Sequence, residues 1–517
     1  MSPKPFRNEP LTDFAKPANR KAMEQALSKV RAQIGTEYPI VIGGEEIHTN
    51  DKLNSINPSR PSEVVAVFSK ADSALASRAI ETAAAKFEEW KWVDPKKRAG
   101  YLFKAAAMMR KRKHEFSAVM IFEVGKTWPE ADADTAEAID FLEFYAREML
   151  RFASRQPITK HPQERNELRY IPLGVGVVVP PWNFPLAILT GMTSAAVVTG
   201  NTVVLKPSSD SPWTGWMFFN LMREVGLPPG VINFVTGSGA EVGDVLVAHP
   251  QTRFVSFTGS KEVGIHINEL AAKVQPGQKW LKRVVAEMGG KDSIVIDDQT
   301  DLAAAAQATL TSAYGFQGQK CSAASRVIVV ESVYDKFLAI LKEKVEKLKV
   351  GPGDDPSNSV GPVINKGSRD KILQYIDIGV REGGRLLAGG KAVGEGYFIE
   401  PAIIADVDPK ATIAQEEIFG PVLAVVKAKD FDHALEIANN TEYGLTGGVW
   451  TKNRKKIERA KKLFHVGNFY VNRKITGALV GVHPFGGFNM SGTDSKAGGR
   501  DYLLLFMQAK ALSEKVR

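Results

Sequence analysis

Cys321, the only cysteine of the 517-residue chain, is the candidate nucleophile of the stretch YGFQGQKCSAASR. An ionised thiol attacks carbonyl carbons and forms covalent intermediates. The residues around it are small or polar and can leave the sulfur accessible: Gly318, Gln319, Lys320, Ser322 and Ala323. The Lys320 amine could favour the thiolate or could simply be solvated. Because a lone cysteine is more often a small buried hydrophobic side chain, the stretch alone leaves both interpretations open.

Two other polar residues could take part in carbonyl chemistry. Glu287 ends an apolar run in EMGGK, where a carboxylate can act as a general base. Asn183 lies in the rigid turn PPWNFP, and its amide can donate a hydrogen bond to a developing oxyanion. The ordinary alternatives are an exposed acid before a turn and a turn-stabilising asparagine.

Several stretches could contact a phosphate or a sugar hydroxyl. FTGSKEVG places Gly259 and Ser260 where a strand meets a helix; free amides there suit a phosphate, although Ser260 could be a plain N-cap. VVLKPSS places Lys206 at a strand end, and GSGAEVG misses the spacing of the dinucleotide fingerprint by one residue. The histidines are dispersed without metal-ligand spacing, so we expect no metal site.

These stretches follow apolar runs that alternate with helical patterns from Val175 onward. GVGVVV, TVVLKP, VINFVTG and FVSFTGS predict short buried strands, and a second alternating set begins near Val284. The pattern predicts an α/β fold whose parallel sheets are covered on both faces and bind ligands at the carboxyl ends of their strands. Upstream of Val175, we predict helices at residues 18–35, 72–123 and 134–152 and a hairpin at YPIVIGGEEI. Within the alternating region, we predict a helix at AEVGDVLVAH, between VINFVTG and FVSFTGS.

Composition and charge favour a soluble globular protein with a solvated basic surface over a nucleic-acid or membrane protein. The net charge is +9, but basic residues are mixed with acids, as in LKEKVEKLKV. The uncharged stretch from Tyr170 to Leu205 is interrupted by Pro180, Pro181 and Pro185, which argues against a membrane span. One cysteine excludes an intramolecular disulfide, and the N-terminus lacks an apolar signal-peptide core, so we expect a cytoplasmic protein.

Seven motifs occur together in one order: PWNFP, VVLKPS, FTGS, EMGGK, GQKCSAASR, EEIFGP and PFGGFNMSG. Jointly they resemble the NAD(P)-dependent aldehyde dehydrogenase superfamily, from the region of Tyr38 to the C-terminus. The resemblance is closest to its L-glutamate γ-semialdehyde dehydrogenase (1-pyrroline-5-carboxylate dehydrogenase) branch, which produces glutamate in proline breakdown. It rests on GQKCSAASR, on TGALVGVHPFGGFNMSGTDSKAGG and on ADADTAEAIDFLEFYAREM.

The resemblance implies three catalytic roles. Cys321 resembles the nucleophile that attacks the aldehyde carbon. Asn183, with the backbone amide of Cys321, resembles the oxyanion hole for the thiohemiacetal, and Glu287 matches the base that activates water to hydrolyse the thioester. Sulfur suits this reaction because covalent capture makes hydride loss possible and because a thioester hydrolyses readily.

The resemblance also implies an NAD(P) site. Lys206 and Glu417 correspond to ribose ligands. Gly259 and Ser260 correspond to the pyrophosphate contact, and Trp182 and Phe419 correspond to the walls of the cofactor pocket. Ser209 stands where many NAD-preferring relatives have an acid that binds the adenosine ribose. We expect NAD as the cofactor. NADP use stays open, because a serine does not repel the 2′-phosphate of NADP.

For the substrate, the resemblance points to the Gly477–Ala478 backbone and the Ser322 hydroxyl as carboxylate ligands. Phe184 and Phe485 resemble aromatic walls around the aliphatic chain. The ordinary alternatives are a turn at Gly477–Ala478 and a plain loop hydroxyl at Ser322.

The resemblance also implies a division of the chain into three parts. We expect an NAD(P)-binding domain from residues 1–155 and 176–286 and a catalytic domain from residues 287–484. Residues 156–175 and 485–517 would form a small β oligomerisation element. The family resemblance implies a homodimer or a trimer of dimers.

Three alternatives accompany the predicted oxidation of glutamate semialdehyde. The first is an aldehyde dehydrogenase for another semialdehyde. The second is a CoA-acylating dehydrogenase, which needs no base, so Glu287 argues against it. The third is a catalytically silent protein on the same fold, against which the joint presence of Cys321, Glu287 and Asn183 argues.

Overall fold

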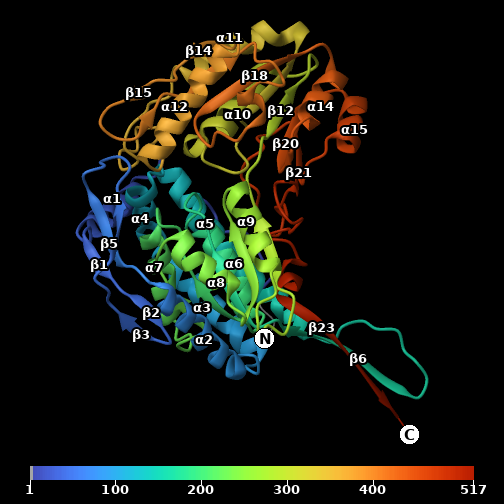
Figure 1. The fold of residues 1–517 in the computed structure, drawn as a ribbon. Helices are drawn as coiled ribbons and strands as arrows, with labels where there is room; N and C mark the ends of the chain where they lie inside the picture. The colour runs from blue at the N-terminus through green and yellow to red at the C-terminus, as the bar shows by residue number, and fades with distance from the viewer. Residues whose placement is uncertain (1–3, 517) are drawn as a thin grey trace.

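The computed structural model describes residues 4–516 and shows two lobes, each built around a seven-stranded sheet. In Figure 1, blue to green segments form the larger lobe and yellow to orange segments form the other. A two-stranded arm of β6 (Glu164–Pro172) and β23 (Met507–Lys515) projects from the larger lobe. The predicted α/β fold class is confirmed.

The sheet of the larger lobe has the strand order β11-β10-β7-β8-β9-β2-β3. Its strands from β11 to β9 are parallel, whereas β2 and β3 form an antiparallel hairpin at one edge. The bounds are β2 Ile40–Ile42, β3 Glu45–Ile47, β7 Val175–Val179, β8 Thr202–Leu205, β9 Ile232–Phe234, β10 Thr252–Thr258 and β11 Arg283–Glu287. The carboxyl ends of the parallel strands therefore meet at one edge of the sheet.

Helices cover both faces of this sheet, because successive strand residues point to opposite sides. Val178 and Val203 join one core, while Val177 and Val204 join the other. The first core contains α3 Pro95–Lys111, α4 Lys113–Val124, α5 Trp128–Ala153, α6 Ala187–Val198 and α7 Pro212–Glu224. The second contains α2 Ser73–Trp90, α8 Asp244–Ala248 and α9 Lys261–Ala272.

The sheet of the second lobe has the order β14-β17-β18-β13-β12-β20-β21, parallel except for β14. Its strands are β12 Ser293–Ile296, β13 Arg326–Val330, β14 Arg385–Ala388, β17 Ala402–Ala405, β18 Val422–Ala428, β20 Thr446–Trp450 and β21 Asn468–Val471. One face packs against α10 Leu302–Tyr314 and α11 Tyr334–Val345. The other packs against α12 Lys366–Arg381, α13 Thr412–Gln415, α14 Phe431–Asn439 and α15 Arg454–Leu463.

Smaller elements complete the body. α1 (Pro17–Arg31) packs against α4, and β1 (Thr36–Tyr38), β5 (Val64–Ser69) and β4 (Lys52–Ile56) form a three-stranded sheet. Two short hairpin-like pairs are β15 Ala392–Val393 with β16 Phe398–Ile399, and β19 Tyr443–Gly444 with β22 Phe488–Asn489.

The arm is an antiparallel ribbon that pairs Glu164 with Lys515 at one end and Pro172 with Met507 at the other. Residues 485–506 do not enter it. They return to the body, where Phe485 pairs with Ala497 and Gly492 pairs with Glu287. The division into three domains stays a prediction.

Most predicted elements lie close to their expected places, such as α1 and the β2–β3 hairpin. The segment AEVGDVLVAH is an exception, because only Asp244–Ala248 is α-helical. A wider π-helical turn, Gly239–Gly243, precedes it and has glycines at both ends, which weaken a helix. Across residues 4–516, no helix is long and apolar enough to cross a membrane.

Candidate active site

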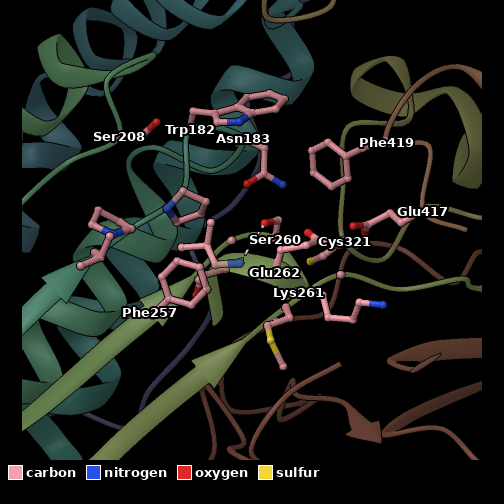
Figure 2. Close-up of a pocket in the computed structure, with 18 of the residues that line it drawn as sticks. Trp182, Asn183, Ser208, Phe257, Ser260, Lys261, Glu262, Cys321, Glu417 and Phe419 are labelled. Atoms are coloured by element: carbon pink, nitrogen blue, oxygen red, sulfur yellow. Dashed lines mark hydrogen bonds between the residues drawn. The ribbon is translucent and has the colours of Figure 1, made fainter. Parts of the chain in front are cut away.

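A cavity of about 800 Å³ opens at the carboxyl ends of β7, β8 and β10, with the second lobe forming its opposite wall. Figure 2 shows Cys321 in this cavity together with Asn183 and Glu417. The cavity brings together these predicted residues: Trp182, Asn183, Lys206, Ser209, Gly259, Ser260, Cys321, Glu417 and Phe419. They come from segments far apart in the sequence, so the fold assembles the predicted cofactor and nucleophile residues into one site.

A left-handed turn immediately precedes Cys321, the predicted nucleophile. Phe316, Gln317 and Gly318 have φ angles of 48°, 57° and 68°, a conformation that non-glycine residues seldom adopt. The buried Gln317 amide secures the turn by donating hydrogen bonds to the carbonyls of Gly125 (3.2 Å) and Pro362 (2.8 Å). Backbone strain of this kind persists only where the surroundings hold it, and here it presents Cys321 to the cavity.

Asn183 lies directly against this turn. Its Nδ2 atom donates a hydrogen bond to the Gln319 carbonyl at 3.1 Å, and Gln319 Oε1 in turn accepts one from the Ile364 amide at 2.9 Å. The Asn183 side chain is almost fully buried. An asparagine amide has two N–H groups, so the second can donate to an oxygen that develops beside Cys321.

The surroundings of Cys321 favour its protonated form. Burial raises the pKa of the Cys321 thiol, and the carboxylates of Asp292, Glu417 and Glu287 raise it further. Lys320 does not offset them, because its ammonium pairs with Glu130 at 2.6 Å. The thiol therefore needs a base before it can attack a carbonyl carbon.

Glu287 ends β11 but does not line the cavity. Its carboxylate accepts hydrogen bonds from the Ser495 hydroxyl and from the Gly487 amide (3.4 Å), on the loop that follows β21. Burial raises the pKa of Glu287 to about 8. In this position the carboxylate faces Ser495 and not the cavity.

The paired glycines of EMGGK have a steric reason. A Cβ atom at Gly290 would lie 2.8 Å from the Cys321 carbonyl oxygen, and one at Gly289 would overlap the Glu417 carboxylate. The Gly290 amide donates a hydrogen bond to Glu417 Oε1 at 3.0 Å. This turn thus fixes Glu417 beside the nucleophile loop, where burial raises the pKa of Glu417 to about 7.

The cofactor side of the cavity contains a buried amine, that of Lys206, which is 5% exposed. Among the residues that the structure describes, its Nζ has only a 3.5 Å hydrogen bond, to the Pro207 carbonyl. Burial lowers the pKa of Lys206 to about 8. Ser260 caps α9 by accepting a hydrogen bond from the Val263 amide at 3.4 Å. A buried amine and a helix start on one cavity suit the hydroxyls and phosphates of a dinucleotide.

The residues predicted to bind the substrate do not line this cavity: Phe184, Ser322, Gly477, Ala478 and Phe485. Gly477 has a φ angle of +73°, and its carbonyl accepts a hydrogen bond from Arg473 at 3.4 Å. Ser322 is buried, and its carbonyl accepts one from the Thr446 hydroxyl at 3.4 Å. Their shared role in carboxylate binding stays a prediction.

Lys126 is a residue of the site region for which the sequence carried no signal. Its fully buried ammonium lies 4.2 Å from the Phe184 ring centroid and 4.4 Å from the Phe316 ring centroid. It also pairs with Asp134 at 2.8 Å, and Asp134 accepts a hydrogen bond from the Ala187 amide at 2.6 Å. Lys126 therefore joins the Phe184 ring to the turn that presents Cys321.

Within the described residues, no group of three or more acidic, histidine or cysteine side chains could hold a metal ion.

Comparison with known proteins decides the family. The aldehyde dehydrogenase family model matches residues 46–512. This chain belongs to the aldehyde dehydrogenase family. The predicted superfamily resemblance is confirmed.

Relatives within the family match almost the whole chain. A 1-pyrroline-5-carboxylate dehydrogenase of Geobacillus sp. (strain WCH70) is 59% identical over 99% of both chains. The 1-pyrroline-5-carboxylate dehydrogenase 2 of Bacillus subtilis (strain 168) is 57% identical over 99% of both. The crystal structure of 1-pyrroline-5-carboxylate dehydrogenase from Thermus with bound NAD is 51% identical, with a TM-score of 0.97 and complete coverage of both chains.

Proposed function

We propose that this protein oxidises L-glutamate γ-semialdehyde, the open-chain form of 1-pyrroline-5-carboxylate, to L-glutamate with NAD. The main support for this proposal is that Cys321, Asn183 and Glu417 line one cavity. Full-length relatives named 1-pyrroline-5-carboxylate dehydrogenase narrow the aldehyde to this substrate.

The first covalent step uses the Cys321 thiol. Its sulfur attacks the aldehyde carbon while its proton passes to a base, which gives a tetrahedral thiohemiacetal. Asn183 Nδ2 and the Cys321 backbone amide donate hydrogen bonds to the developing oxyanion. Because Asn183 is already held against Gln319, little reorganisation is needed at this step.

The second step releases the acid from the thioester that remains on Cys321 after hydride loss. Glu287 takes a proton from water and the resulting hydroxide attacks the thioester carbon. Sulfur then leaves as the thiolate and takes that proton back from Glu287 to become the thiol. Glu287 must first part from Ser495 and Gly487, because these residues hold its carboxylate in the described position. The same movement lets Glu287 accept the thiol proton in the first step.

Lys206, Ser260 and Glu417 would hold NAD. The buried Lys206 amine and the Glu417 carboxylate suit ribose hydroxyls, and the start of α9 at Ser260 suits the pyrophosphate. When bound, NAD supplies the hydride acceptor. The edge-to-face pair of Trp182 and Phe419, with centroids 5.5 Å apart, walls the cavity near Cys321.

The substrate carboxylate would bind the backbone amides of Gly477–Ala478 and the Ser322 hydroxyl. Phe184 and Phe485 would flank the aliphatic chain. Recognition of a charged end distinguishes this substrate from simple aldehydes, which leave those donors without a partner.

Steady-state kinetics test the proposal. We expect a higher kcat/KM for glutamate semialdehyde than for succinate semialdehyde or propanal, with NAD as the oxidant. The variant Cys321→Ala should lose turnover and keep NAD binding. The proposed substrate is wrong if another aldehyde has the highest kcat/KM, and the nucleophile assignment is wrong if Cys321→Ala keeps full activity.

We also propose that the β6–β23 arm assembles copies of the chain into a homodimer or a trimer of dimers. The arm leaves the body as a lone two-stranded ribbon whose residues are mostly exposed. Such unpaired strand edges are rarely left free in solution. Light scattering on the intact protein gives the number of copies, and a monomer would contradict the proposal.

A further inference from the structure

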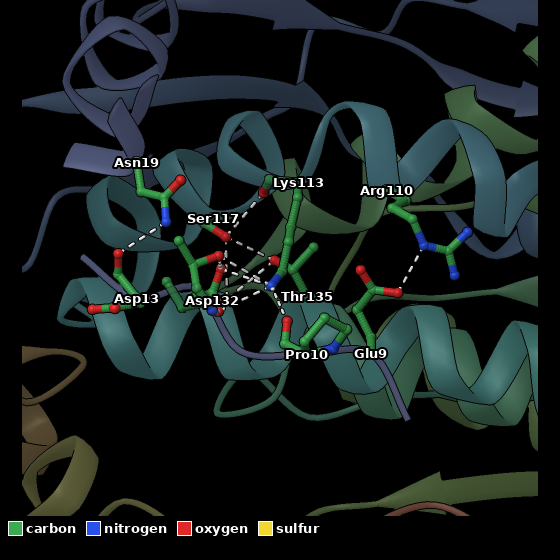
Figure 3. Close-up of polar contacts among 11 residues, drawn as sticks. Glu9, Pro10, Asp13, Asn19, Arg110, Lys113, Ser117, Asp132 and Thr135 are labelled. Atoms are coloured by element: carbon green, nitrogen blue, oxygen red, sulfur yellow. Dashed lines mark hydrogen bonds and ion pairs between the residues drawn. The ribbon is translucent and has the colours of Figure 1, made fainter. Parts of the chain in front are cut away.

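An N-terminal strap, residues 4–14, runs along α5 and is tied to it (Figure 3). Thr12 donates hydrogen bonds to Asp132 from its amide (2.7 Å) and its hydroxyl (2.6 Å). Lys113 donates to the same carboxylate and to the Pro10 carbonyl (3.0 Å). Since Asp132 is nearly fully buried, the strap is a fixed part of the lobe. It lies outside the residues that the family model matches.

Asn8 of the strap bridges α5 to the loop that follows β21. Its Nδ2 atom donates one hydrogen bond to Asp140 Oδ2 at 2.8 Å and another to the Val480 carbonyl at 3.0 Å. These two bonds use both N–H groups of the amide. The Glu9 backbone amide donates to the other Asp140 oxygen at 2.6 Å, which fixes the carboxylate that orients Asn8.

Phe6 closes the same contact from the strap side. Its ring packs edge-to-face on Phe144 of α5 at 5.2 Å, and both rings cover Gly481. A Cβ atom at Gly481 would lie 3.0 Å from Phe144 and 3.2 Å from Phe6, and its φ angle of +76° favours glycine. On its other side, the Gly481 amide donates to the Gly498 carbonyl at 2.9 Å. The Val480–Gly481 peptide is thus held from two directions.

This peptide directly follows the residues that we assign to the substrate carboxylate. Val480 is two positions after Ala478, within a tight turn in which the amides of Val482 (3.0 Å) and His483 (2.8 Å) donate to the Leu479 carbonyl. Only Leu479 separates Val480 from Ala478, so a fixed Val480 carbonyl restrains the direction of the Gly477–Ala478 amides that precede the turn. Loss of that restraint lets the loop sample conformations that misplace those donors.

We propose that Asn8 is a positioning residue for substrate specificity, which holds the Gly477–Ala478 loop in the orientation that binds a carboxylate. The proposal rests on the proposed function of that loop. An aldehyde without a carboxylate makes no use of these amides, so its oxidation does not depend on Asn8. A strap that only stabilised the fold would affect all aldehydes alike.

The test compares Asn8→Ala with Asn19→Ala. Asn19 donates a hydrogen bond to the carbonyl of Asp13 at 2.9 Å, near the other end of the strap, and within the described residues it makes no hydrogen bond to the loop. We expect Asn8→Ala to raise KM for glutamate semialdehyde about tenfold, with little change in kcat. The reason is the loss of the Asn8 hydrogen bonds to Asp140 and to the Val480 carbonyl. The KM and kcat of Asn8→Ala for propanal should equal those of the wild type. The KM and kcat of Asn19→Ala should equal those of the wild type for both aldehydes.

Two results would overturn the proposal: an unchanged KM for glutamate semialdehyde in Asn8→Ala, or equal losses with glutamate semialdehyde and propanal. If Asn8→Ala does not fold, Phe6→Leu, which loosens the same contact, is measured against the same criteria.

Wild-type kinetics separate the two proposals. A wild type that does not prefer glutamate semialdehyde refutes the proposed function, whereas a preference that Asn8→Ala and Phe6→Leu leave intact refutes only the role of the strap.

Discussion

Replacing Ser495 with alanine removes the hydroxyl that donates a hydrogen bond to the Glu287 carboxylate. That bond stabilises the ionised form of Glu287 and opposes the effect of burial, which raises its pKa to about 8. With the bond gone, the pKa of Glu287 should rise further. Less of the base is then ionised at neutral pH, but the ionised carboxylate also leaves position 495 more easily, as it must before it acts.

The size of the effect follows from the hydrogen bond. A hydrogen bond to a charged group is worth about 1.5 kcal/mol, which corresponds to about one pH unit. At pH 7 the ionised fraction of Glu287 should fall from about a tenth, given a pKa of about 8, to about a hundredth. Below pH 8 the smaller ionised fraction and the easier departure from position 495 cancel, so Ser495→Ala should match the wild type in kcat/KM at pH 7. Near pH 10, where Glu287 is ionised in both proteins, its kcat/KM should be about tenfold higher.

The assay is the pH profile of kcat/KM, which reports groups of the free enzyme. Its acid limb should move to higher pH in Ser495→Ala and vanish in Glu287→Gln. Ser491→Ala is the matched control, because the Ser491 hydroxyl lies on the same loop but accepts a hydrogen bond from Gly444 instead of contacting Glu287. An acid limb of Ser495→Ala that stays in place or moves to lower pH would refute the reasoning.

Three further changes test other parts of the site. Asn183→Ala should lower kcat/KM about 10²- to 10³-fold through loss of an oxyanion donor, while the Kd for NAD from a binding titration stays unchanged. Lys126→Met strands the buried Asp134 charge and should cost about 3–5 kcal/mol in denaturant unfolding, most of which the double variant with Asp134→Asn should recover. Ser209→Glu should lower kcat/KM with NADP at least about tenfold by repelling a 2′-phosphate and leave NAD turnover intact; equal losses with both would contradict the assigned position.

The parallel sheets could be predicted from the sequence because the strand signal is local. Short apolar runs such as GVGVVV and FVSFTGS are typical of strands covered on both faces. Once the strands are parallel, the segments after β7, β8 and β10 must share one edge. This geometry is why Asn183, Lys206 and Ser260 line one cavity.

The contacts that tune the site could not be predicted, because they join residues far apart in the chain. Gln317 reaches Gly125, and Ser495 reaches Glu287, through side-chain contacts that no motif predicts. The predicted helix at AEVGDVLVAH was partly wrong for a local reason, since glycines at both ends of 239–243 loosen its first turn. The strap contact from Asn8 to Val480 spans almost the whole chain and follows no sequence period.

Burial moves four ionisable groups of the site towards their neutral forms. It raises the pKa of Cys321, Glu287 and Glu417 and lowers the pKa of Lys206. A protonated thiol is a poor nucleophile. We therefore expect Cys321 to resist oxidation and reaction with other electrophiles before substrate binds. The same environment makes catalysis depend on a base that reaches the thiol only after it leaves Ser495. In the proposed mechanism, the movement of Glu287 away from Ser495 therefore activates a thiol that burial otherwise keeps protonated.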